Sequence, residues 1–357
     1  MSDAGSNDPV IIIGAGPAGL AAAETLAKRN VDYVILEKGS AVASALRRVD
    51  PEMRLLSPKR LSLMPDMSPE PETPTYMPFR VVVHELERYQ QQHELKVQLE
   101  CNVIEIRKDE TGFVVSYWDG HGTRRELRGS HVINATGIIS NPLLPDDFLF
   151  PMGRWRHSVD VRAEDLAVAH RLLVVGGGAS AAEVLETWLS IRQEGDRAWL
   201  SLRSKLCAIP HWIFGIDIHY FSWLPEHVPT EWFGWLARRF TEPMTGRAVV
   251  RAIRKGLIKR VPRVREYKNW EVEFENGEKI EPDLIVFATG FDYLKEHLKE
   301  VVDFDPDGRP IVKNCESTRA PGMFLLGYRF GRTFASPYLR GIARDAKFVA
   351  ERIAKEK

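Results

Sequence analysis

One pattern occurs twice in this sequence: a short β-branched strand, a glycine-rich turn and an alanine-rich helix. The first copy begins with the apolar run Val10–Ile13, continues through the turn Gly14–Gly19 (GAGPAG) and ends in a helix that reaches Lys28. The second copy begins with Leu172–Val175, and its turn, Gly176–Ala181, reads GGGASA. Each copy is typical of a buried parallel strand that leads into a nucleotide-binding turn. The chain is therefore expected to fold around two parallel sheets.

The first turn has the residues that a dinucleotide needs at fixed positions. Gly14 allows the tight turn, Gly16 lets a pyrophosphate approach the backbone, and Gly19 lets the helix pack closely on the strand. The helix N-terminus faces the phosphate charge. The next strand, Tyr33–Leu36, ends in Glu37, which is placed to accept ribose hydroxyls and would repel a 2′-phosphate. The candidate contacts of this first cofactor are Gly14, Gly16, Pro17, Ala18, Gly19 and Glu37.

The second turn differs from the first in the charge that follows it. Its third glycine is replaced by Ala181, an accepted variant, and the strand Ala198–Leu202 ends in Arg203 rather than in an acid. A guanidinium at this place suits the 2′-phosphate of NADPH. A solvated arginine at a strand end is the alternative reading. The candidate NADPH contacts are Gly176, Gly178, Ser180, Ala181, Arg203 and Lys205.

A further repeat supports the duplication. The apolar strands in Val132–Gly137 and Ile285–Gly290 both lead into Ala-Thr-Gly, and each is expected to end one nucleotide-binding unit. Two dinucleotide sites, one ending in an acid and one in a base, imply two different cofactors that face each other. FAD and NADPH are the natural pair, because hydride transfer needs nicotinamide and flavin in contact. These repeats add the candidate contacts Ala135, Thr136, Gly137, Thr289 and Gly290.

Composition excludes several other classes of protein. The 357 residues suggest two or three domains. The 49 basic and 49 acidic side chains give zero formal charge, which argues against a nucleic-acid binder. Cys101, Cys207 and Cys315 are too far apart for a CxxC pair, a disulfide framework or a zinc site. We see no metal-ligand cluster, no signal peptide and no membrane-spanning run, and expect a cytoplasmic protein.

These motifs resemble the flavin-containing monooxygenase superfamily, in particular its short members and the plant auxin-forming flavin monooxygenases. The resemblance runs from about Pro9 to Ile353 and includes the segments Met53–Lys59, Ser140–Pro142 and Phe287–Phe291. It implies an α/β fold with two Rossmann-like dinucleotide-binding domains, in which the NADPH domain is inserted into the FAD domain. The expected division is an FAD-binding segment over residues 1–145, an NADPH-binding domain over 146–290, a crossover over 291–317 and a second FAD-binding segment over 318–357.

The resemblance also adds candidate site residues. Gly327 follows the strand Met323–Leu326, and a helix runs from about Pro337 to Lys355. In this superfamily the start of that helix closes over the pyrimidine end of the flavin. His157, four residues after Gly153, is a weak catalytic candidate that would orient NADPH; a hydrogen-bonded structural histidine is the equal alternative. Further candidate FAD contacts are Lys38, Arg47, Val103 and Gly327.

The reaction implied by the resemblance is oxygenation. NADPH reduces FAD, O2 adds to the flavin to give a C4a-(hydro)peroxyflavin, and one oxygen atom is inserted into a small organic substrate. The first alternative is an NADPH-dependent flavoprotein reductase of a quinone or small disulfide. For a disulfide, Ala18 stands where some short relatives have a cysteine. The second alternative is a non-catalytic flavin or NADPH sensor that docks on membranes.

The segment 210–260 is unusual. Nine aromatic residues lie between 210 and 240, and a basic stretch follows. Arg247, Arg251, Arg254, Lys255 and Lys259 recur at helical spacing opposite apolar residues, which predicts one amphipathic basic helix. A peripheral membrane contact is one interpretation. The others are a solvated basic face over a buried apolar one together with a substrate lid, and a homodimer contact.

Overall fold

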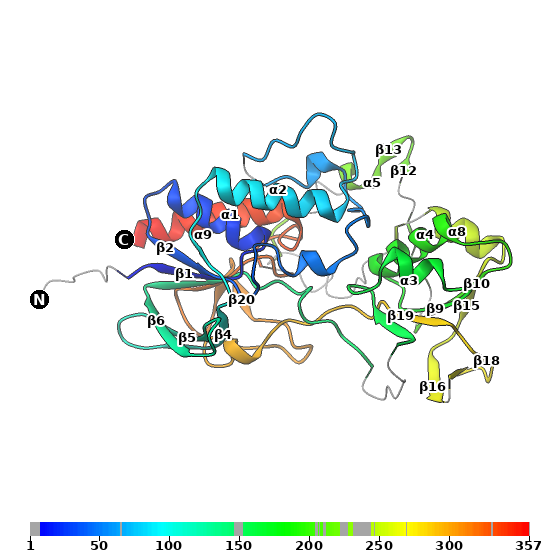
Figure 1. Cartoon of the computed structure of the whole chain (residues 1–357). Helices are drawn as coiled ribbons and strands as arrows, with labels where there is room; N and C mark the ends of the chain where they lie inside the picture. The colour runs from blue at the N-terminus through cyan, green and yellow to red at the C-terminus, as the bar shows by residue number, and fades with distance from the viewer. Residues whose placement is uncertain are drawn as a thin grey trace, which may run out of the picture.

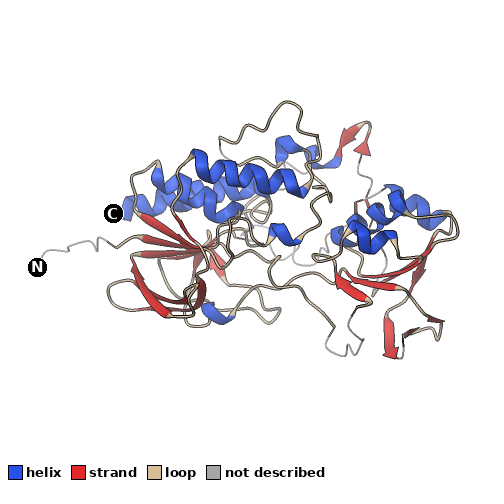
Figure 2. Cartoon of the chain, viewed as in Figure 1, coloured by secondary structure: helices blue, strands red, loops and turns tan. Residues whose placement is uncertain are grey.

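The computed structural model describes residues 8–64, 66–145, 153–203, 206, 208–209, 212–221, 228–230, 244–245, 247–268, 270–329 and 331–356. Figure 1 shows two halves, each built on its own sheet and joined by extended segments. In each half, helices cover one face of the sheet and a small antiparallel sheet covers the other (Figure 2). The predicted α/β class with two parallel nucleotide-binding sheets is confirmed.

The first sheet is centred on β1, the strand that precedes the first glycine turn. β1 pairs in parallel with β2 on one side and with β7 on the other, and β7 pairs in parallel with β22. The edge strands β20 and β21 lie within the expected crossover 291–317 and add an antiparallel end to this sheet. In spatial order the strands are β20 (Val312–Lys313), β21 (Glu316–Ser317), β22 (Met323–Leu325), β7 (His131–Asn134), β1 (Val10–Ile13), β2 (Tyr33–Leu36) and β3 (Val97–Gln98).

Both faces of the first sheet are buried, because successive side chains of β1 point to opposite sides. Val10 and Ile12 pack against the helices, whereas Ile11 and Ile13 pack against the opposite layer. The helices are α1 (Pro17–Ala27), α2 (Phe79–Gln92) and α9 (Leu339–Glu356). The opposite layer contains β4 (Asn102–Lys108), β5 (Phe113–Trp118), β6 (Arg124–Gly129) and the short helix η3 (Glu296–Leu298). Two further short helices are η1 (Leu46–Arg48) and η2 (Lys59–Leu61).

The second sheet repeats this arrangement around β9, with every strand parallel to its neighbours. Leu172 and Val174 of β9 face the helices, and Leu173 faces the antiparallel layer. In spatial order its strands are β15 (Ile258–Val261), β10 (Arg197–Ser201), β9 (Arg171–Val175), β19 (Leu284–Phe287) and β8 (Trp155–His157). The helices are α3 (Ala163–Ala167), α4 (Ala179–Ile191) and α8 (Arg247–Arg254), and the other layer is β16 (Val264–Lys268), β17 (Glu271–Phe274) and β18 (Lys279–Ile280).

The basic helix is shorter than the sequence predicts. Gly256, with φ of 74°, ends α8: its N–H donates to the carbonyl of Ile253, and the N–H of Leu257 donates to that of Ala252. These two hydrogen bonds form a Schellman motif, which ends a helix at a residue with a left-handed backbone conformation. The prediction that Lys259 continues the helix is wrong, because Lys259 lies in β15.

Two contacts fix the halves beside each other. The guanidinium of Arg48 binds the carboxylate of Asp160 through both oxygens, at 2.9–3.1 Å. The buried carboxylate of Asp50 accepts the backbone N–H of Ala163 at 2.6 Å. The two chain connections between the sheets also pair with each other, because the N–H of Leu143 donates to the carbonyl of Gly290.

The remaining elements lie between β10 and α8. They are β11 (Ala208–Ile209), β12 (Trp212–Ile213), β13 (Ile216–Asp217), the short helix α5 (Ile218–Phe221) and β14 (Met244–Thr245). Strands β12 and β13 form a hairpin, which Figure 1 shows near the first half rather than on the second sheet. In the described ranges, no helix is both long and apolar enough to cross a membrane.

Candidate functional site

The first glycine turn has one open side. A Cβ atom on Gly14 would lie 2.8 Å from the carbonyl oxygen of Ala135, and one on Gly19 would lie 1.9 Å from that of Gly14. A Cβ on Gly16, in contrast, would meet nothing within 4 Å. Gly14 and Gly19 therefore serve the packing of strand, turn and helix, and Gly16 leaves its backbone accessible from outside. This is the arrangement that a pyrophosphate requires, so the turn fits the FAD predicted for it.

Glu37 lies beside this turn and is held by the protein itself. Its carboxylate accepts the N–H groups of Ala15 and Gly39, at 2.6 and 2.8 Å, and the hydroxyl of Ser44 at 2.6 Å. A carboxylate has about four acceptor positions, so one remains for a ribose hydroxyl. The three donors fix the direction in which that position points.

The other predicted FAD contacts fall into two groups. The structure brings Ala135 and Gly327 to the turn: the N–H of Ala135 donates to Ile13, and a Cβ on Gly327 would lie 3.5 Å from that of Ala18. Pro17 and Ala18 begin α1, and Thr136 and Gly137 follow Ala135. The structure gives less support to three others: Lys38 is exposed, Arg47 forms an ion pair with Glu87, and Val103 lies in β4 of the antiparallel layer and packs against the core of the first half.

The second glycine turn has the same construction as the first. Gly176 has φ of 125°, and a Cβ there would lie 2.1 Å from the carbonyl oxygen of Ala288, the counterpart of Ala135. A Cβ on Gly178, like one on Gly16, would meet nothing within 4 Å. Ser180 and the buried Ala181 belong to the first turn of α4. Both turns thus have one glycine whose open side can receive a pyrophosphate.

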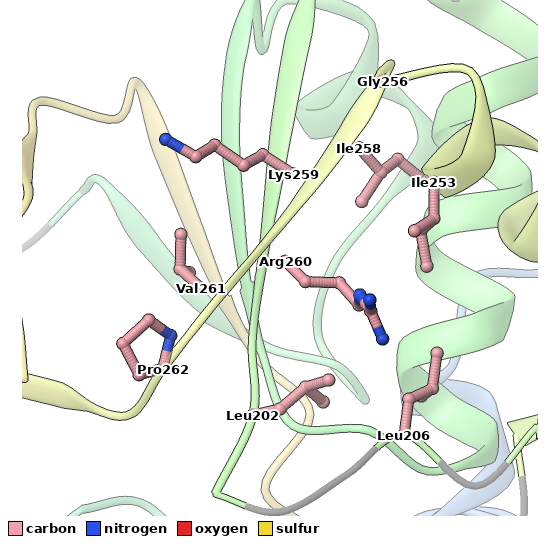
Figure 3. A pocket seen from close by; sticks show the side chains of 9 residues that line it. All are labelled: Leu202, Leu206, Ile253, Gly256, Ile258, Lys259, Arg260, Val261 and Pro262. Carbon is pink, nitrogen blue, oxygen red and sulfur yellow. The ribbon is translucent and has the colours of Figure 1, made fainter. Parts of the chain in front are cut away.

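The cation predicted to read the 2′-phosphate stands next to this second turn. Arg203 is exposed and lies two residues beyond β10, and the side chain of its neighbour Leu202 comes within 2.6 Å of the Cβ position of Gly177. The other predicted cation, Lys205, lies outside the described residues. Beyond Leu202 is a hollow of about 780 Å³ whose walls include Leu206 and Ile253 (Figure 3).

His157 is buried and both ring nitrogens are occupied. Nε2 donates to the carbonyl of Gly290 at 3.1 Å, and Nδ1 accepts the N–H of Val159 at 3.3 Å, which is the pattern of a neutral ring. Burial lowers the pKa of His157, which keeps it neutral. Thr289 precedes Gly290 in the second Ala-Thr-Gly segment and donates its hydroxyl to the carbonyl of Leu143. The geometry favours the structural alternative for His157, because its hydrogen bond to Gly290 ties β8 to the second Ala-Thr-Gly segment.

A buried polar network lies at the first Ala-Thr-Gly segment, and no sequence motif indicates it. The side-chain oxygen of Asn134 accepts Nε2–H of His297 at 2.9 Å, and its amide nitrogen donates to the hydroxyl of Tyr328 and to that of Thr136. Burial lowers the pKa of His297 to about 4, so the ring is neutral. A comparison of the two repeats singles out Asn134, which stands where the second copy has Phe287, but gives no sign of its partners His297 and Tyr328.

The segment between β10 and α8 reaches the first half at two places. The hydroxyl of Tyr76 donates to the buried carboxylate of Asp217 in β13 at 2.5 Å. Farther along, the N–H of Thr230 donates to the carbonyl of Arg332 at 3.1 Å, and Pro229 forms a β-bridge with Thr333. The second contact is to the loop between Gly327 and α9, which leads into the helix start that is expected to close over the flavin. These contacts agree with the lid interpretation of this segment.

Helix α8 does not present its apolar face to the outside. Val249 and Ala252 are buried in the core of the second half, and Ile253 packs against the same core. Arg251 and Arg254 are exposed on the opposite side. The structure therefore has a basic solvated face over a buried apolar one, which is one of the three interpretations of the sequence.

The described cysteines are structural. Cys101 and Cys315 are both buried, and burial raises the pKa of each thiol. Each is therefore a poor nucleophile at neutral pH. Cys207 lies outside the described residues.

Two sheets, each with an open glycine turn beside an acid or a base, are the arrangement expected of an oxidoreductase that binds two dinucleotides. The chain belongs to the pyridine nucleotide-disulphide oxidoreductase family, which residues 11–200 match. This membership confirms the prediction of an oxidoreductase that uses FAD and NADPH. The predicted resemblance to the flavin-containing monooxygenase superfamily is also confirmed by the relatives.

Three known proteins illustrate the relationship. An indole-3-pyruvate monooxygenase of Arabidopsis thaliana is 27% identical over 97% of this chain and 90% of its own length. A flavin monooxygenase from Stenotrophomonas maltophilia superposes with a TM-score of 0.77 at 22% identity, over 98% of both chains. A bacillithiol disulfide reductase from Bacillus cereus gives a TM-score of 0.76 at 19% identity, over 98% of this chain and 99% of the other. The fold is thus shared by oxygenases and reductases.

Proposed function

We propose that the protein is a flavin monooxygenase that uses NADPH and O2 to insert one oxygen atom into a small organic substrate. The burial of Cys101 and Cys315 supports oxygenation over the reduction of a disulfide, because a disulfide reductase needs an accessible nucleophilic thiol; the third cysteine, Cys207, lies outside the described residues. Ala18, the position of the cysteine in some short relatives, lies within the first turn. The monooxygenases among the relatives support the same conclusion.

Bound FAD supplies the redox chemistry, accepting a hydride from NADPH and reacting with O2. The chain positions both cofactors and excludes water. Gly16 and Gly178 would receive the two pyrophosphates, Glu37 a ribose hydroxyl of FAD, and Arg203 the 2′-phosphate of NADPH. The contacts of Asp217 and Thr230 with the first half would hold the lid segment against the flavin side of the site. Exclusion of water there protects reactive intermediates from hydrolysis and proton leakage.

We assign the cofactors to segments of the chain in accordance with the two sheets. Residues 1–145 and 318–357 would bind FAD, residues 146–290 would bind NADPH, and residues 291–317 would return the chain to the first half. The contribution of β20 and β21 to the first sheet supports that return path.

Among the described residues of 210–260, the hairpin and α5, and not α8, expose apolar side chains that a peripheral membrane contact or a dimer contact could use. Phe214, at the tip of the hairpin, is 97% exposed, and Ile216, Tyr220 and Phe221 are also exposed. The buried apolar face of α8 leaves only its charges for an anionic surface.

Arg203→Ala is expected to raise the KM for NADPH about 10- to 150-fold and to leave the KM for NADH unchanged. A charge-assisted hydrogen bond contributes about 1.5–3 kcal/mol to binding. NADH has no 2′-phosphate, so it does not form this bond and its binding does not change when the guanidinium is removed. Steady-state oxidation of both nucleotides measures the effect. An equal rise for both would show that Arg203 does not read the phosphate.

Oxygenation itself is tested with labelled oxygen. NADPH turnover under 18O2 with indole-3-pyruvate or a simple thioether is expected to give product that contains one labelled atom, in proportion to the NADPH consumed. If all reducing equivalents appear as hydrogen peroxide, and a quinone sustains fast anaerobic turnover, the protein is a quinone reductase instead.

A further inference from the structure

A second arginine, Arg260, faces the hollow that begins at Leu202, the neighbour of Arg203 in the sequence. The hollow lies where β10 and β15 end, and its apolar wall is formed by Leu202, Leu206 and Ile253. Arg260 of β15 also lines it, and none of the described lining residues is acidic. Figure 3 shows the guanidinium of Arg260 directed toward the side of the strand on which Leu206 and Ile253 lie.

The direction of Arg260 follows from the strand. Alternate residues of a strand point to opposite faces, and Ile258, two residues earlier, is buried in the core beneath the helices. Arg260 is therefore on the helix side and, unlike Ile258, is exposed. Lys259 points to the other side and forms an ion pair with Glu278 at 2.7 Å. Arg260 has no hydrogen-bond or ion-pair partner among the residues that the structure describes.

Leu202 connects the hollow with the second glycine turn. Its side chain touches the Cβ position of Gly177 on one side and lines the hollow on the other. Its N–H donates to the carbonyl of Val261 at 3.1 Å, which fixes the end of β10 against the end of β15. The residue paired with Arg260 in β10 is Leu200, three residues before Arg203. Arg203 and Arg260 thus belong to the carboxyl-terminal ends of neighbouring strands.

The path of a bound dinucleotide leads to this place. When a pyrophosphate lies on such a glycine turn, the adenosine ribose lies at the end of the following strand, which here is β10. The apolar wall suits the adenine ring. Two guanidinium groups suit a doubly charged phosphate, because each can donate two parallel hydrogen bonds.

We propose that Arg260 is a second specificity-determining residue for NADPH and binds its 2′-phosphate together with Arg203. This inference rests on the proposed use of NADPH. It adds to the NADPH site a residue, Arg260, that no sequence motif indicates. The end of β10 supplies Arg203, and the end of β15 supplies Arg260. Discrimination against NADH is then shared between them.

The test measures binding to the FAD-loaded protein by calorimetry, with adenosine 2′,5′-bisphosphate and 5′-AMP as probes. Arg260→Ala is expected to weaken the bisphosphate about five- to fiftyfold and to leave 5′-AMP unchanged, because only the first probe has a 2′-phosphate. Arg260→Glu should weaken it further. The matched control is Arg254→Ala, which removes the same charge from an exposed position of α8 that does not line the hollow.

Each outcome decides a separate point. If Arg260→Ala binds the bisphosphate as tightly as the unaltered protein while Arg203→Ala does not, the role of Arg260 is refuted and the use of NADPH stands. If Arg254→Ala weakens the bisphosphate as much as Arg260→Ala does, the effect is one of general charge and the inference is again refuted. If the unaltered protein binds both probes equally, NADPH preference and the inference both fail. Unchanged binding of 5′-AMP confirms that the second half of each variant is folded, and flavin absorbance does the same for the first half.

Discussion

Gly16→Ala is expected to leave the fold intact and to remove most of the FAD from the purified protein. A Cβ on Gly16 meets no protein atom within 4 Å, and its φ of −82° is open to any residue. Alanine is a poorer helix N-cap than glycine, which costs at most about 1 kcal/mol. The same Cβ stands where the pyrophosphate must approach, and overpacking there costs about 1–3 kcal/mol. FAD affinity should therefore fall about five- to 150-fold.

The second half of the chain supplies the matched variant. Gly178→Ala adds a Cβ in equally open space at the N-cap of α4. It should purify with full FAD and bind NADPH about five- to 150-fold more weakly, by the same overpacking. Flavin content, NADPH titration and thermal unfolding measure the three quantities. Loss of FAD from the Gly178 variant, or retention of both cofactors in both variants, would contradict the assignment of one cofactor to each turn.

The features predicted best from sequence are those in which local pattern and packing agree. The strands before the glycine turns are short apolar runs whose residues are buried on both faces, such as Val10–Ile13. The turns themselves need glycine where φ is positive or a carbonyl oxygen is close, as at Gly14 and Gly176. Such requirements are visible in the residue types alone.

The features that sequence reasoning missed depend on contacts between distant segments. No sequence motif indicates His297, because its partner Asn134 is 163 residues away and only the fold brings them together. The basic spacing continues past Gly256 and predicts a helix that includes Lys259, whereas the glycine ends the helix and starts the turn into β15. Arg260 follows no motif, and its importance depends on the pairing of β10 with β15.

Acidification is expected to destabilise the protein through His297. Burial lowers its pKa from 6.5 to about 4 in the folded state, because the ring is removed from water beneath the first sheet. Below pH 6.5 the unfolded chain binds a proton that the folded chain does not, so stability falls as pH falls until both states are protonated near pH 4. One pKa unit corresponds to about 1.36 kcal/mol. The loss attributable to His297 is then about 2 kcal/mol at about pH 5 and about 3 kcal/mol below about pH 4.

The control for this effect is His297→Gln, whose amide can still donate to the side-chain oxygen of Asn134 but cannot take up a proton. Urea unfolding of both proteins at about pH 7.5 and about pH 5 gives four free energies. The difference between the two pH values should be about 2 kcal/mol smaller in the glutamine variant, by the same linkage. His157, whose pKa burial also lowers, contributes with the same sign in both proteins and therefore cancels. Equal pH dependence in the two proteins would mean that the buried ring of His297 is not held neutral, and that the network around Asn134 tolerates a charge.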